Sequence, residues 1–197
     1  MKKNIVVFAS GNGSNFINIY EFIEKNKIDA EIVLLVSNNP KCGAVRFAKN
    51  NYIDIKIIND YRYSSLFKQN KEYELVLKYY KTDLILLAGF MKKIPRNIVD
   101  LYKNKIMNIH PSLLPKYGGK GFYGMNVHEA VIKEKEKYSG ATVHFVNNEY
   151  DKGAIIIQKK IKINKCESAA DLAARVLKVE HSIYPKALNV YLNKLKV

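Results

Sequence analysis

Residues 4–15 have the sequence NIVVFASGNGSN, in which an unbroken apolar run of strand length leads into a glycine-rich turn. An apolar stripe at helical spacing, from Phe16 to Ile23, follows the turn directly. Apolar runs without polar alternation are typical of parallel strands whose two faces are both covered by helices. This stretch therefore predicts an α/β fold.

The same alternation of strand and helix continues along the chain. Because parallel strands need a long crossover connection, usually a helix, the pattern predicts a Rossmann-like three-layer fold. Its sheet is expected to be twisted, mostly parallel and about seven-stranded, with helices on both faces. Strands are predicted at 4–10, 31–37, 54–58, 83–88, 105–109, 140–147 and 154–163, and helices at 14–27, 44–50, 64–80, 95–102 and 168–190.

Length and composition favour one globular domain. The 197 residues lie near the upper end of the roughly 100–200 residues of a typical domain, so a single domain over 1–197 is expected. No apolar run reaches the roughly 18–20 residues of a membrane span. The first residues superficially resemble a signal peptide, but they lead into the 11–15 loop without a cleavage pattern. Two cysteines, Cys42 and Cys166, predict no disulfide framework and suit a cytoplasmic protein.

The formal net charge of +15 (33 − 18) raises the question of an anionic partner. The lysines are dispersed, and no dense basic run is interleaved with aromatic residues, as a nucleic-acid-binding face would require. The charge is interpreted as a compositional bias of surface positions. No nucleic-acid or membrane partner is expected, although a positive field attracts small anionic substrates.

The loop between the first strand and the first helix is a candidate anion site. Backbone N–H groups at a helix start can hold a phosphate, and Gly13 is expected to permit its close approach. Phe16 replaces the third glycine of a dinucleotide fingerprint, no acidic residue ends the second strand, and the P-loop lysine is missing, so NAD and ATP are disfavoured. A phosphomonoester is favoured over a plain structural turn. The candidate residues are Gly11, Asn12, Gly13, Ser14 and Asn15.

Asn108 and His110 end a predicted strand and lie on the same side of it by alternation. Pro111 biases His110 toward an extended backbone. An amide donor beside an imidazole suits acyl transfer, which needs one group for a developing oxyanion and one to move protons. A structural histidine is the alternative. Ser112 lies outside any nucleophile motif, and the other histidines lack metal-ligand spacing, so no metal is expected.

Five segments together resemble a known family. They resemble, in order from Ile5 to about Tyr191, the phosphoribosylglycinamide formyltransferases, the folate-dependent glycinamide ribonucleotide transformylases of purine synthesis. The segments are Gly11-Asn12-Gly13-Ser14-Asn15, Leu87-Ala88-Gly89-Phe90-Met91, Asn108-Ile109-His110-Pro111-Ser112-Leu113-Leu114-Pro115, Thr142-Val143-His144-Phe145-Val146 and Glu180-His181-Ser182-Ile183-Tyr184-Pro185.

The resemblance implies a reaction in which the formyl group of 10-formyltetrahydrofolate passes to the amine of glycinamide ribonucleotide. It implies that Asn108 binds the formyl oxygen and that His110 donates a proton to the tetrahedral intermediate. Asp151 would raise the pKa of His110 and help to move a proton through water. This aspartate is expected to lie in a solvated turn.

The resemblance also assigns two binding regions, a phosphate-binding half at about 1–100 and a folate and catalytic half at about 101–197. The 11–15 loop would hold the ribonucleotide phosphate, with Glu180 at the glycinamide end and Lys178 as a further phosphate contact. The folate is expected as co-substrate, with no metal and no NAD, in a monomer or weak homodimer. Implied folate-binding residues are Phe90, Met91, Lys92, Lys93, Ile94, Asn108, Asn147, Asn148, Glu149, Tyr150 and Asp151.

The chain departs from the family pattern at several positions. Lys92 stands where an arginine is frequent, and a lysine lacks the planar fork of a guanidinium. The 64–80 helix carries Lys71 where an arginine would reach the folate. Leu177 replaces a polar phosphate contact, with Lys178 beside it. Gly118-Gly119 replaces a Pro-Gly pair, which is expected to loosen that loop without touching the chemistry.

Other functions share parts of this pattern. Methionyl-tRNA formyltransferase is expected to carry a further RNA-binding domain, and formyltetrahydrofolate hydrolase an N-terminal regulatory domain. A non-enzymatic anion-binding module would leave Asn108 and His110 unexplained. A nucleic-acid-binding protein would bind duplexes with a steep dependence on salt.

Overall fold

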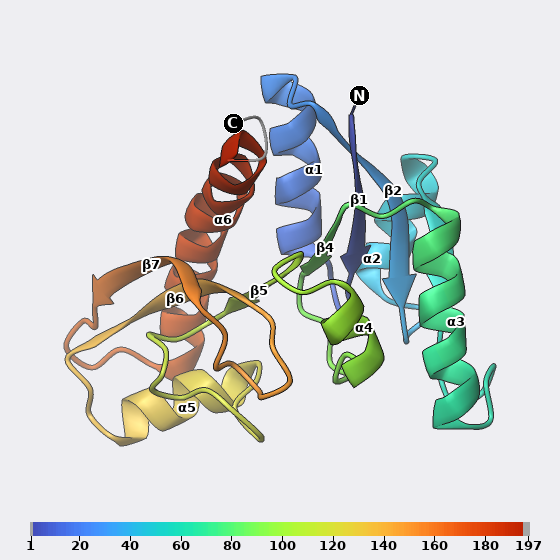
Figure 1. Ribbon diagram of the computed structural model, residues 1–197. Coiled ribbons are helices and arrows are strands. Elements are labelled where there is room, and N and C mark those ends of the chain that lie inside the picture. The colour runs from blue at the N-terminus through green and yellow to red at the C-terminus, as the bar shows by residue number, and fades with distance from the viewer. Residues whose placement is uncertain (1, 195–197) are drawn as a thin grey trace. The chain divides into compact units, whose positions relative to one another are not determined.

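The computed structural model describes residues 2–194 (Figure 1). Its strands form a seven-stranded, mostly parallel sheet in the order β3-β2-β1-β4-β5-β6-β7. The predicted fold class is confirmed. Met1 and residues 195–197 of the predicted domain lie outside the described residues. The elements are β1 (Lys3–Phe8), α1 (Ser14–Asn26), β2 (Ala30–Ser37), α2 (Gly43–Asn50), β3 (Asp54–Ile57), α3 (Leu66–Tyr79), β4 (Leu84–Leu87), α4 (Arg96–Leu101), β5 (Ile106–His110), α5 (Met125–Lys133), β6 (Tyr138–Phe145), β7 (Ile155–Lys162) and α6 (Ala169–Lys194).

The chain divides into two compact units, Met1–Met107 and Asn108–Val197. In the first unit, β1 pairs in parallel with β2 and β4, and β2 pairs in parallel with β3. Right-handed crossovers place α1 and α2 on one face and α3 and α4 on the other, because the strand order reverses after β3. The packing of α1 with α2 and of α3 with α4 agrees with this. The reversal between β1 and β4 is where ligands bind in such sheets.

Ser10 ties together the carboxyl ends of three strands in this unit. Its N–H donates to the carbonyl of Gly89 after β4 (3.1 Å), and its hydroxyl donates to the side chain of Asn38 after β2 (2.6 Å). The N–H of Met91 donates to the same hydroxyl (2.9 Å). The apolar run before Ser10 is fully buried, as the sequence predicts. The predicted phosphate loop and the 90–94 segment are therefore anchored to the same edge of the sheet.

The second unit consists of β6, β7, α5, α6 and the end of β5. β6 pairs with β7 in an antiparallel hairpin, and α6 packs on both strands and on α5 (Figure 1). α6 is long and buries a continuous apolar stripe that includes Leu172, Val176, Ile183 and Leu188. No helix within residues 2–194 is long and apolar enough to cross a membrane.

α5 is absent from the predicted elements, although it buries Val127, His128 and Val131 at helical spacing. Two glycines with positive φ, Gly121 and Gly124, precede it. Glycines are typical of loops, and the short apolar stripe behind them is weak evidence for a helix. The remaining predicted elements are present, with boundaries displaced by a few residues.

Candidate active site

The predicted phosphate loop follows β1 and opens α1. Gly13 has a φ of +79° and precedes the helix, where its carbonyl accepts the N–H of Ile17 (2.8 Å). The first turn of α1 contains no acidic residue that would offset the positive end of the helix dipole. Gly11 and Asn12 are exposed, Ser14 is half-buried, and Asn15 is buried. The loop therefore has the backbone arrangement that anion binding requires.

Gly13 is required by the protein's own packing. A Cβ on Gly13 would lie 2.8 Å from the Cβ of Ala44 in α2, and a Cβ on Gly43 would lie 2.7 Å from the carbonyl oxygen of Asn12. The N–H of Ala44 donates to the carbonyl of Gly11 (3.1 Å). The start of α2 thus presses against the loop at Gly13. Gly11 differs, because a Cβ there would meet no atom within 4 Å.

The 90–94 segment, implied to bind folate, begins after Gly89, which has a φ of +77°. Phe90 packs edge-to-face on Phe8, with 5.2 Å between ring centroids, and Ile94 is buried. Met91 is 55% exposed. Lys92 and Lys93 are exposed. The segment presents an apolar side chain and two ammonium groups from a backbone fixed at both ends.

Lys92 forms an ion pair with Asp60 (3.5 Å). The hydrogen bond from Gln69 (2.8 Å), followed by the charge of Lys92, lowers the pKa of Asp60. The side chain of Gln69 is therefore engaged in a hydrogen bond within the first unit, whereas Lys71 is exposed on α3. Lys71 thus remains a candidate for the role of the missing arginine.

The second unit brings together the three predicted catalytic side chains. Nδ1 of His110 lies 3.6 Å from Oδ2 of Asp151, and the amide nitrogen of Asn108 lies 3.5 Å from Oδ1 of the same carboxylate. His110 is 5% exposed, and Asn108 is half-buried. Alternation along β5 puts both side chains on one side, as the sequence predicts.

Burial and charge have opposite effects on His110. Burial lowers the pKa of His110 below its ordinary value, because a low-dielectric surrounding disfavours the imidazolium. The Asp151 carboxylate raises this pKa, and so does the carbonyl of Tyr117, while His144 lowers it further. Asp151 therefore acts in the expected direction, but burial outweighs it.

Asp151 does not lie in a solvated turn, so that expectation is wrong. Its side chain is 13% exposed, and its backbone has a φ of 55°. Burial raises the pKa of Asp151, but contacts with His144, with His110 and with the Gly119 N–H together lower it below its ordinary value. The aspartate is held as a carboxylate facing two imidazoles.

Gly118-Gly119 does touch the proposed chemistry, contrary to the sequence expectation. The N–H of Gly119 donates to Oδ2 of Asp151 (2.9 Å), the same oxygen that faces His110. A Cβ on Gly118 would lie 3.1 Å from the Cβ of Asp151. This loop therefore helps to orient the carboxylate.

His144 was not assigned a role from the sequence. Its Nδ1 lies 2.8 Å from the carbonyl oxygen of Phe145, which only accepts, so Nδ1 carries a proton. In the neutral ring, Nε2 then accepts the amide N–H of Asn108 (3.1 Å). His144 thus orients the Asn108 amide. The segment Thr142-Val143-His144 carries a sequence signal for this position, since alternation puts Thr142 and His144 on one face of a strand.

The remaining predicted binding residues lie in the 147–150 loop and on α6. Residues 147–150 are exposed in the loop between β6 and β7, where Asn147 accepts the N–H of Glu149 (3.0 Å). On α6, Lys178 is exposed, and Glu180 is 9% exposed. Among residues 2–194, no group of histidine, cysteine and carboxylate side chains is arranged to hold a metal ion.

Known proteins are similar to this chain in sequence and in fold. The profile of the family described as "Formyl transferase" matches residues 3–188. A phosphoribosylglycinamide formyltransferase from Escherichia coli (strain K12) is 33% identical over 94% of this chain and 85% of its own length. A chloroplastic one from Arabidopsis thaliana is 41% identical over 93% of this chain. The chain spans about three-fifths of the length of this and two other plant relatives (63%, 59% and 61%).

A solved structure is also similar to this chain. The crystal structure of glycinamide ribonucleotide transformylase 1 from Geobacillus kaustophilus matches 98% of this chain and 100% of its own, with a TM-score of 0.90 and 32% identity. The family match extends through both compact units and includes Asn108, His110 and Asp151. On this evidence the chain belongs to the formyl transferase family.

Proposed function

We propose that this chain transfers the formyl group of 10-formyltetrahydrofolate to the amine of N1-(5-phosphoribosyl)glycinamide, a step of purine biosynthesis. The observation that carries the proposal is the cluster of Asn108, His110 and Asp151. Relatives and solved structures named as enzymes of this activity support it.

In this reaction the amine nitrogen attacks the formyl carbon. A new C–N bond forms, the bond from the formyl carbon to the folate nitrogen breaks, and the proton lost by the amine ends on that folate nitrogen. The Asn108 amide donates one N–H to His144 (3.1 Å) and the other, over a longer distance, to Asp151 (3.5 Å). The second N–H would donate to the formyl oxygen instead as negative charge grows there. His110 would supply the proton, and Asp151 would stabilise the imidazolium.

Substrate recognition follows from the chemistry of each segment. The 11–15 loop would hold the ribonucleotide phosphate through its backbone N–H groups, and Glu180 would accept from the glycinamide amine. The 90–94 segment would line the folate with the apolar side chain of Met91, and Lys92 or Lys93 would attract the folate carboxylates. Residues 147–151 would also contribute to folate binding.

Formyl transfer to three acceptors tests the proposal. The purified chain is incubated with 10-formyltetrahydrofolate and either glycinamide ribonucleotide, unformylated methionyl-tRNA or no acceptor. We expect turnover that depends on glycinamide ribonucleotide. Turnover only with the tRNA, or hydrolysis at an equal rate without acceptor, would instead identify one of the two related activities.

Gly11→Val tests the phosphate assignment. The new side chain enters open space beside the exposed backbone, so it should block the phosphate without straining the fold. Because hydrogen bonds to a charged group contribute about 1.5–3 kcal/mol, we expect KM for the ribonucleotide to rise by roughly 10–100-fold. KM for the folate should change little. Steady-state kinetics with each substrate varied in turn measure both.

Gly13→Val is the informative comparison. It places a side chain against the backbone of Ala44 at a positive φ, so we expect it to lower Tm as well as activity. If Gly11→Val leaves KM for the ribonucleotide unchanged, the loop does not bind the phosphate.

A further inference from the structure

Tyr117 contacts His110 through its backbone. Nε2 of His110 lies 2.7 Å from the carbonyl oxygen of Tyr117, a closer contact than the one between Nδ1 and Asp151. The carbonyl belongs to a residue with a φ of 54°, a conformation that side-chain-bearing residues rarely adopt. The hydroxyl of Ser112 donates to the carbonyl of Lys116 (2.7 Å) and approaches that of Tyr117 (3.5 Å). The carbonyl is thus aimed at His110 by a strained turn.

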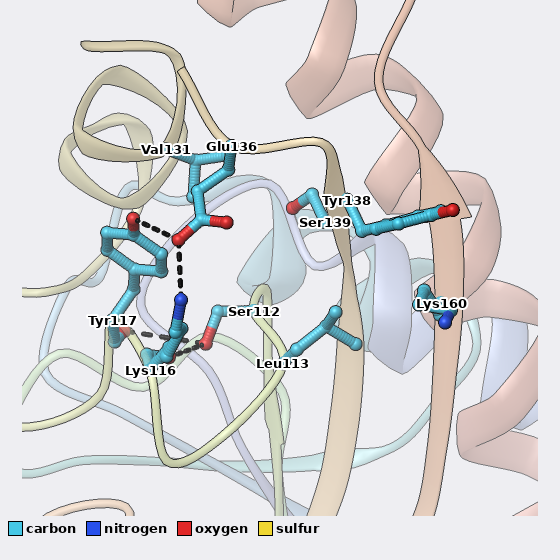
Figure 2. Close-up of a pocket in the computed structure, with 9 residues that line it drawn as sticks. All are labelled: Ser112, Leu113, Lys116, Tyr117, Val131, Glu136, Tyr138, Ser139 and Lys160. Carbon is cyan, nitrogen blue, oxygen red and sulfur yellow. Dashed lines mark hydrogen bonds and ion pairs between the residues drawn. The ribbon is translucent and has the colours of Figure 1, made fainter. Parts of the chain in front are cut away.

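The phenol of Tyr117 is held by two carboxylates. Its hydroxyl lies 2.5 Å from Glu134. The same hydroxyl lies 3.1 Å from Glu136, and the ammonium of Lys116 lies 2.7 Å from Glu136 (Figure 2). Burial, followed by the hydrogen bonds to Glu134 and Glu136, raises the pKa of Tyr117, so the phenol keeps its proton. The hydroxyl can therefore only donate to these carboxylates.

Packing alone does not hold the ring in place. One side of Tyr117 borders a cavity of about 240 Å³, whose other lining residues include Ser112, Val131, Glu136 and Ser139 (Figure 2). The ring also contacts Phe122 edge-to-face, with 5.8 Å between centroids. Because the ring of Tyr117 has open space on one side, the hydrogen bonds from its hydroxyl to Glu134 and Glu136 restrain its position.

We propose that Tyr117 is a positioning residue for His110: its phenol, anchored on Glu134 and Glu136, holds its own backbone carbonyl against Nε2 of His110. A carbonyl oxygen only accepts, so Nε2 keeps its proton in both the neutral and the charged ring. The proton that His110 gains and loses is then the one on Nδ1, the nitrogen facing Asp151. The carbonyl fixes the tautomer, because the hydrogen bond made by one ring nitrogen decides which nitrogen of a catalytic or metal-binding histidine carries the proton.

Tyr117→Phe tests the proposal, because it keeps the ring and removes only the anchor. Nitrogen-15 NMR of histidine-labelled protein reports which ring nitrogen of neutral His110 carries the proton. We expect the Nε2–H form in the wild type and a mixture in Tyr117→Phe. Tyr61→Phe is the matched control, since Tyr61 is 96% exposed.

The kinetic readout relies on the proposed formyl transfer. Weakening one hydrogen bond to His110 should lower kcat by roughly three- to tenfold, with both KM values nearly unchanged. The carbonyl raises the pKa of His110, so its loss should move the alkaline limb of the pH profile to lower pH. The other titratable groups facing His110, which are Asp151, His144 and His128, are unchanged in this variant.

Changing the carboxylates gives an independent route to the same result. Glu134→Ala with Glu136→Ala should reproduce the Tyr117→Phe tautomer mixture, and adding Tyr117→Phe to this pair should have little further effect, because residues of one network are not additive. Glu134→Gln with Glu136→Gln keeps acceptors for the phenol and should restore the Nε2–H form.

The outcomes are distinct. A wild-type tautomer and pH profile in Tyr117→Phe would overturn the proposal, and so would a fall in Tm with the tautomer unchanged, since Tyr117 would then be a structural anchor only. The NMR measurement needs no turnover. A tautomer shift in a chain that transfers no formyl group would therefore support the positioning role and contradict the proposed function.

Discussion

Asn108→Ala is expected to lower kcat by about 10²–10³-fold, because losing one oxyanion donor typically costs roughly 2.7–4 kcal/mol of transition-state stabilisation. KM for either substrate should change far less, since the charge on the formyl oxygen grows only as the transition state forms. The neighbouring contact of Asn108 with His144 orients the amide, and His144 remains in this variant. Steady-state kinetics and a thermal melt of the same preparation measure the effect.

Two further variants are compared with Asn108→Ala in the same assay. Asn108→Asp should be at least as damaging, because it places a carboxylate beside Asp151 and where the oxyanion must form. Asn193→Ala, at an exposed position of α6, should leave kcat unchanged. A loss of tenfold or less in Asn108→Ala would mean that the amide positions the substrate and does not stabilise the transition state.

Asp151→Asn is expected to lower kcat by roughly 10²-fold or more, the scale of general acid–base catalysis. It should also move the alkaline limb of kcat/KM to lower pH. The Asp151 carboxylate raises the pKa of His110, whereas burial lowers it. Without the charge of Asp151, the pKa of His110 should therefore fall. His110 must be charged to donate a proton, and the attacking amine must be neutral, so the wild-type profile is bell-shaped, with limbs that belong to coupled groups.

Asp151→Asn should also destabilise the fold, because Asp151 is largely buried and accepts the Gly119 N–H. A loss of about 1 kcal/mol corresponds to a fall in Tm of about 2–4 °C for a chain of this size. The pKa of Asp151 is lowered in the folded protein, so its contribution is present above the ordinary carboxylate value and is lost as pH falls through the folded value.

Thermal melts of wild type and Asp151→Asn at several pH values check this sign. The two Tm values should converge toward low pH. Near-full activity with an unmoved alkaline limb would show that another group tunes His110. Loss of activity and of most of the folded population together would show that Asp151 is chiefly structural.

The first half of the fold was predictable because its signals are local. The strand and turn of residues 4–15 carry both the apolar run and the glycines that the structure uses, and the helix from Ser14 was predicted to within one residue of its end at Asn26. α5 was missed because it is short, follows two glycines and buries only Val127, His128 and Val131. The reason for Gly13 was also missed, since the atom that excludes a side chain there belongs to Ala44.

The alternation of strands and helices follows from the local apolar pattern of the chain. Asn108 and His110 share one side of β5 because side-chain direction along a strand has a period of two residues. The surroundings of these two side chains depend on distant segments that fold onto them. Asp151 and His144 reach Asn108 across 43 and 36 residues of chain, and the carbonyl of Tyr117 reaches His110 through a left-handed turn. Burial, which lowers the pKa of His110, likewise depends on every segment packed around that ring. Periodicity acts between neighbours along the chain, whereas proximity across a loop and exclusion of water exist only once the chain has folded.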